Sequence, residues 1–271
     1  MNIVAAMRCE YRRSETLLWT SISVKAAIYL TTVATAAWSN GIAASVFIVL
    51  ASLGQVFLFT SRLSMERHLS LGERLRRLAM LQDGIGREPT TFETAVLPDR
   101  VWDPHEPLIQ DQYYSSVLAK GSRRLVDVTA ECAFFSGRIA SSAWTVFLIV
   151  SVAASGILLF SLVLVAIIGT AQSRLEVVAK CVLIGITFWM TEDLIDMALR
   201  YRELASSCER ILQECFRLLG EKSPSMDGAY LVLQEYDAAV AAAPPLPSRI
   251  YRRRNEDLSR IWNEMRFRGE P

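Results

Sequence analysis

Two long apolar runs lie almost back to back near the start of the chain, at Leu17–Trp38 and Gly41–Thr60. The second run contains no charged residue, and the first contains only Lys25. A helix of about 20 apolar residues is long enough to cross the roughly 30 Å of hydrocarbon in a bilayer. Because a short polar turn at 39–41 joins the two runs, the pattern predicts a transmembrane helical hairpin.

A second pair of apolar runs follows in the other half of the chain. No charged residue occurs between Arg138 and Arg174, so we place a third span at 144–168, with a turn after it. The fourth span, at about 175–194, is the weakest, because only Cys181–Thr191 is free of charge. A re-entrant or interfacial helix is the alternative for this last run.

These runs predict an all-α integral membrane protein with four transmembrane helices in two hairpins and with helical cytosolic extensions. Lysine and arginine are concentrated outside the two tight turns, which contain only Arg174. By the positive-inside rule, both termini and the central segment are cytoplasmic. The predicted parts are a basic lead-in with the first hairpin (1–60), a cytosolic helix-loop-helix (61–142), the second hairpin (143–199) and C-terminal cytosolic helices (200–271).

Apolar residues spaced by three and four predict that the spans continue as helices in the cytosol. One such extension has Leu71, Leu75 and Leu78 on one face, with Arg74, Arg76 and Arg77 elsewhere. Another follows the fourth span, with a seam at Leu204, Cys208, Ile211, Cys215 and Leu218. Two further helices are predicted at about 226–243 and 255–266, separated by an extended segment that contains three prolines.

A polar stripe follows one face of the first predicted span. Ser21, Lys25, Tyr29, Thr32 and Thr35 recur at steps of three and four residues. In lipid, such a stripe turns toward protein or water, so it predicts either a helix–helix contact or a pore-lining face. The candidates for lining a bundle or pore are Ser21, Lys25, Thr32 and Thr35, with Thr187 and Thr191 of the fourth span.

Three acidic residues, Glu192, Asp193 and Asp196, lie at the predicted cytoplasmic end of the fourth span. They have the chemistry of metal ligands or proton carriers, but charge pairing at a water boundary is the simpler interpretation. Lys25 and Glu192 lie at comparable predicted depths. We therefore expect an ion pair between the first and fourth spans.

Composition narrows the classes of function. The formal net charge is +1, which gives no argument for a nucleic-acid partner. The five cysteines form no CxxC pair, so we read them as reduced thiols, and the two histidines have no partner at metal-ligand spacing. No nucleophile–base set or phosphate-binding glycine loop is present. We therefore expect no enzyme, no metal and no cofactor.

A basic run, Arg252, Arg253 and Arg254, follows Tyr251 near the C-terminus. Guanidinium groups bind phosphate, so these four residues are ligand-binding candidates for anionic lipid headgroups or a nucleotide phosphate. A solvated helix start is the alternative interpretation.

Two segments carry a resemblance to a known family. RRLVDVTAECAFFSGRIA (123–140) and EYDAAVAAAPPLPSRIYRRRNEDLSRIW (235–262), set around two pairs of spans, resemble the SMODS-associating four-transmembrane effector proteins of bacterial nucleotide-signalling antiphage systems. The resemblance implies a multi-pass protein of the bacterial inner membrane that perturbs the membrane during phage infection. It also implies a cyclic nucleotide as the activating signal.

Together these observations predict an effector that disrupts or permeabilises the membrane. Four helices per chain do not enclose a wide channel, so we expect a homo-oligomer. The alternative is a non-conducting membrane anchor or scaffold whose cytosolic helices recruit a partner protein. An enzyme at the membrane surface is the third and least favoured reading.

The predicted ion pair gives a first test. We expect Lys25→Met to lower the thermal stability of the detergent-purified protein, because it leaves the charge of Glu192 under-compensated. Unchanged stability and unchanged activity in this variant would argue against the pair.

Overall fold

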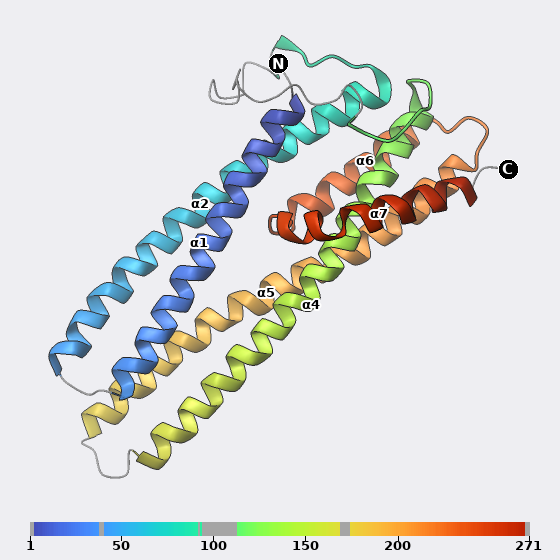
Figure 1. The fold of residues 1–271 in the computed structure, drawn as a ribbon. Coiled ribbons are helices and arrows are strands. Elements are labelled where there is room, and N and C mark those ends of the chain that lie inside the picture. Colours follow the sequence, from blue (N-terminus) through green and yellow to red (C-terminus); the bar gives the residue numbers. More distant parts are fainter. Residues whose placement is uncertain (1–2, 38–40, 92, 94–112, 169–173, 269–271) are drawn as a thin grey trace. The chain divides into compact units, whose positions relative to one another are not determined.

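The computed structural model describes residues 3–37, 41–91, 93, 113–168 and 174–268 (Figure 1). These residues form six helices and no strand, which confirms the predicted all-helical class. The helices are α1 (Ile3–Ala37), α2 (Gly41–Ile85), α4 (Ser122–Ile168), α5 (Arg174–Leu219), α6 (Met226–Ala241) and α7 (Ser248–Arg268).

Four of these helices are unusually long, with 35 residues in α1, 45 in α2, 47 in α4 and 46 in α5. Each joins an apolar run to a charged segment without a break, as the spacing of apolar residues predicts. The nine prolines of the chain all lie outside these four helices. Because an internal proline removes a backbone hydrogen bond and clashes with the preceding turn, its absence allows the long helices to continue.

The chain divides into two compact units, which we describe separately. The polar unit comprises residues 1–15, 66–143 and 200–271, and the apolar unit comprises residues 16–65 and 144–199. Each of the four long helices contributes its apolar run to the apolar unit and its more polar part to the polar unit.

The core of the polar unit is built from the predicted seams. Leu75 and Leu78 of α2 are buried in a cluster with Ile3, Ala6 and Met7 of α1. The α5 seam is buried along its whole length, and so is one face of α6. The buried residues of these two helices include Leu204, Cys208, Ile211, Cys215, Leu218, Ala229, Val232, Leu233, Tyr236 and Val240.

The helix ends also follow local sequence. The side chain of Ser225 accepts a hydrogen bond from the Gly228 amide and caps the start of α6. The start of α7 differs from the prediction, because the helix begins at Ser248 instead of residue 255. The Pro247 carbonyl accepts the amides of Ile250 and Tyr251 at 3.1 and 3.3 Å, so the first turn forms directly after the prolines. Proline is tolerated at the start of a helix, because a backbone N–H at this position would have no partner within the helix.

α4 and α5 approach closely in the polar unit at a glycine. A Cβ atom added to Gly137 would lie 2.9 Å from the Cβ of Cys208. Cys208 is itself buried on α5, so its Cβ has little room to move. Gly137 therefore permits the close packing of these two helices.

We predict that Gly137→Ala lowers the free energy of unfolding by about 1–3 kcal/mol, as overpacking of a tight contact does. Gly156→Ala on the same helix is the matched control, because no atom of the described side chains lies within 4 Å of the added Cβ. The control should unfold at the same or a slightly higher temperature, since alanine favours the helix over glycine. Thermal unfolding of the detergent-purified proteins makes the comparison, and equal melting temperatures would contradict the close contact.

Candidate functional site

The most prominent surface of the apolar unit is a face of α2 that exposes large apolar side chains. Eight of them are between 42% and 65% exposed: Val46, Val49, Leu50, Leu53, Val56, Phe57, Phe59 and Leu63. Soluble monomers rarely expose a contiguous apolar area of this kind, unless it is an interaction surface. We call these residues, with those of α4 given next, the apolar surface.

α4 presents a similar face in the same unit. Its exposed large apolar residues are Val146, Leu148, Ile149, Val150, Val152 and Phe160. Among the described residues, the stretch Ser122–Gly156 of α4 is the one helix that is long and apolar enough to cross a membrane. Only 28% of its most apolar part is buried, whereas the core helix of a soluble protein is mostly buried. Most residues of this most apolar part of α4 therefore face outward.

Packing inside the apolar unit does not account for these outward faces. Ile28 of α1 and Leu58 of α2 form a small buried cluster, with Val24 and Ala51 packed against it. Gly54 lets the two helices meet, since an added Cβ would lie 2.7 Å from Ile28 Cδ1. The Trp19 and Phe147 rings stack at 6.4 Å. On α2 and α4 these contacts involve residues other than those of the apolar surface, whose side chains remain exposed.

The predicted polar stripe and acidic group are described only in part. Ser21 and Lys25 are half-buried on α1, and Asp196 is exposed on α5. The other predicted residues have side chains that lie outside the described residues, and so does the predicted pair of Lys25 with Glu192. They are Tyr29, Thr32, Thr35, Thr187, Thr191, Glu192 and Asp193.

The four predicted ligand-binding residues lie together at the start of α7, and all four are exposed. Tyr251 lies against Phe135 of α4, with ring centroids 6.3 Å apart. Arg254 donates a hydrogen bond to the Ser142 hydroxyl. Arg252 and Arg253 form no ion pair with any residue that the structure describes.

Sequence reasoning missed a buried arginine in the polar unit. We expected Arg76 to face away from the leucine seam, yet it is almost fully buried. Its guanidinium donates to Glu73 at 2.7 Å and to Asp237 at 2.9 Å, and it lies over the Tyr236 ring at 4.3 Å. A buried charge needs such partners to offset its lost hydration. The i,i+3 spacing of Glu73 and Arg76 was a weak signal of part of this group.

Tyr11 extends the Arg76 group to α1. Its hydroxyl donates a hydrogen bond to Glu73 at 2.5 Å. Burial, together with the negative charge of Glu73, raises the pKa of Tyr11 well above its ordinary value. The phenol therefore remains protonated and keeps its role as a donor at neutral pH.

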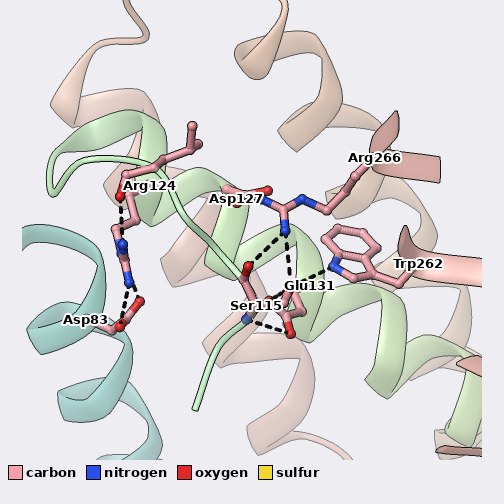
Figure 2. A network of polar contacts seen from close by, with 8 residues as sticks. Asp83, Ser115, Arg124, Asp127, Glu131, Trp262 and Arg266 are labelled. Carbon is pink, nitrogen blue, oxygen red and sulfur yellow. Dashed lines mark hydrogen bonds and ion pairs between the residues drawn. The ribbon is translucent and has the colours of Figure 1, made fainter. Parts of the chain in front are cut away.

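A second polar network fixes α7 to the rest of the polar unit (Figure 2). The Arg266 guanidinium donates to buried Asp127 at 2.7 Å and to the Ser115 carbonyl at 3.0 Å. Figure 2 shows Trp262 pointing to the same serine, whose hydroxyl accepts the indole N–H at 3.1 Å. Ser115 in turn donates to Glu131 through both its amide and its hydroxyl at 2.9 Å. Burial raises the pKa of Glu131.

Further buried acids tie α1 to other elements. Glu10 is 1% exposed and contacts both His68 of α2 and Arg13 of its own helix. Glu15 accepts the backbone amide of Ser248 at 2.9 Å, which connects α1 to the start of α7. Because these partners are 58 and 233 residues away in sequence, no local pattern could have revealed them.

The cysteines of the α5 seam behave as packing residues. Burial raises the pKa of both Cys208 and Cys215 to about 12. Very little thiolate is then present at neutral pH, and the thiolate is the form that acts as a nucleophile or metal ligand.

Comparisons of this chain with protein-family models, with curated proteins and with solved structures found no match. The functional argument therefore rests on the residues of this chain.

The Arg266 network gives a stability test. We expect Arg266→Met to lower the free energy of unfolding by about 3 kcal/mol, because Asp127 is left buried without this ion pair. Arg260→Met is the control, since Arg260 is 70% exposed in its pair with Asp257 and should contribute under about 1 kcal/mol. Adding Asp127→Asn to Arg266→Met should recover part of the loss. The free energy of unfolding of the two single variants and of the double variant is measured by thermal unfolding. Equal losses in Arg266→Met and Arg260→Met would contradict a stabilising ion pair between Arg266 and Asp127.

Proposed function

We propose that this chain is a multi-pass bacterial inner-membrane protein that permeabilises the membrane as a homo-oligomer in antiphage defence. The apolar surface of α2 and α4 is the observation that carries the proposal. Apolar area that remains in contact with water costs about 25 cal/mol per Å², whereas in a bilayer core it contacts hydrocarbon. A helix also satisfies its own backbone hydrogen bonds, which is the requirement for a segment in lipid.

Four crossings are proposed, one in the apolar run of each long helix. The stretch in α4 is supported by its length and composition. The run in α2 is supported by the exposed face that begins at Val46 and ends at Leu63. The runs in α1 and α5 are proposed from the sequence pattern. With them, the even number of crossings leaves both termini on the same side, and the distribution of lysine and arginine assigns that side to the cytoplasm.

Permeabilisation is proposed from the polar stripe of α1 and from the family resemblance. The stripe gives each chain one polar helix face, so several copies around an axis would be needed to line a pore. The resemblance supports activation by an infection signal, such as a cyclic nucleotide. The exposed Tyr251 and its neighbouring arginines have the chemistry to hold a phosphate.

Inducible expression in a bacterium with a membrane-potential dye tests the proposal. We expect the wild-type chain to depolarise the cells once it is activated, and Thr32→Leu/Thr35→Leu to abolish the depolarisation, because the stripe loses its hydroxyls. The proposal is supported if the Thr32→Leu/Thr35→Leu variant gives no dye response while its amount in the membrane fraction equals that of the wild type.

The matched control is Thr31→Leu/Thr60→Leu. The hydroxyl of Thr31 is bonded to carbonyls of its own helix, at Ala27 and Ile28, and that of Thr60 to Val56 and Phe57. This control should depolarise like the wild type. A membrane that stays polarised under every activating condition would favour the non-conducting anchor or scaffold instead.

A further inference from the structure

The start of α7 carries an unusual concentration of positive charge. Four of its first seven residues are arginines, at positions 249, 252, 253 and 254, and its first turn contains no acidic residue. The N-terminal end of a helix already carries a partial positive charge from the backbone dipoles, so cations there do not stabilise the helix. Negative charge outside the helix is therefore the electrostatic complement of this turn.

The structure ties this turn to particular residues of the polar unit. Glu15 of α1 accepts the Ser248 amide at 2.9 Å, and Arg254 donates to Ser142 of α4. Just before α7, the Pro245 carbonyl accepts the hydroxyl of Tyr201 of α5 at 2.7 Å. Burial raises the pKa of Tyr201, which keeps this donor protonated.

The tethering residues share one feature of position. Glu15, Ser142 and Tyr201 lie within two residues of the point where their helices pass from the polar unit to the apolar unit. On α4, Ser142 precedes exposed Val146 by four residues, which is about 6 Å of helix rise. On α5, exposed Leu199 precedes Tyr201 by two residues. The half-buried Trp144 lies at the same boundary of α4, where indoles favour the membrane–water interface.

From this placement we infer that the first two turns of α7 form a binding surface for anionic phospholipid headgroups, with Arg252 and Arg253 facing the headgroups and Arg254 as the tether. The inference rests on the proposed membrane location. It deepens that proposal, because it assigns the basic run to lipid and not to a nucleotide phosphate. A polybasic segment at the cytoplasmic leaflet is attracted to anionic lipid over about a Debye length. Because the start of α7 is bonded to residues beside the boundary between the polar and apolar units, we favour a lipid headgroup over a nucleotide phosphate as its ligand.

The test uses the full chain in nanodiscs of phosphatidylcholine alone and of phosphatidylcholine with phosphatidylglycerol. The unfolding temperature of the wild type should rise when phosphatidylglycerol is added, and high salt should remove most of the rise. Arg252→Gln/Arg253→Gln should abolish it. These side chains form no ion pair with described residues, so the variant should fold. Arg252→Lys/Arg253→Lys retains the charge and should retain the rise.

The matched control is Arg210→Gln/Arg260→Gln, which removes two exposed arginines of the polar unit. Arg210 lies ten residues beyond Arg200, where α5 enters the polar unit, and Arg260 lies outside the first two turns of α7. It should respond to phosphatidylglycerol like the wild type. A rise that survives Arg252→Gln/Arg253→Gln would overturn the inference, and so would an equal rise when a soluble cyclic dinucleotide is added to phosphatidylcholine discs. A chain that enters neither kind of disc would instead overturn the proposed membrane location.

Discussion

The pairing of buried charges is the constraint on which the polar unit depends. Arg76, Asp127 and Glu10 each lie on a different helix, and each is almost fully buried. An unpaired charge in such a place costs several kcal/mol, so the helices must adopt the register that brings the partners together. Arg76 fixes α2 against α6 through Asp237, and Asp127 fixes α4 against α7 through Arg266. Apolar seams alone would tolerate a shift by one turn, whereas these pairs do not.

The elements of the fold could be predicted from sequence because their signals are local. The α5 seam from Leu204 to Leu218 repeats every three or four residues, and all five of its predicted positions are buried. Prolines and glycines are also local signals, and they predict where α5 and α6 end. The start of α7 was wrong by seven residues, because four arginines within two turns resemble a solvated segment, although the Pro247 carbonyl begins the helix there.

The polar contacts could not be predicted, because their partners are distant in the chain. Arg76 carries the same charge as its exposed neighbour Arg77, and its burial depends in part on Asp237, which lies 161 residues later. The Ser115 network likewise depends on a loop residue that meets α4 and α7. Of the predicted site, the basic run at the start of α7 lies together as an exposed group, whereas the side chains of Thr32 and Thr35 in the stripe are outside what the structure describes.

The contacts of α7 have a consequence for biosynthesis. α7 follows the other described helices in the chain, and its partners Glu15, Ser115, Asp127 and Ser142 are made more than a hundred residues earlier. Contacts of such long range form late, because the chain between them must first be ordered. A nascent chain in which α7 has not yet been made thus holds Asp127 and Glu15 without these partners, and the polar unit closes only after α7 has been translated.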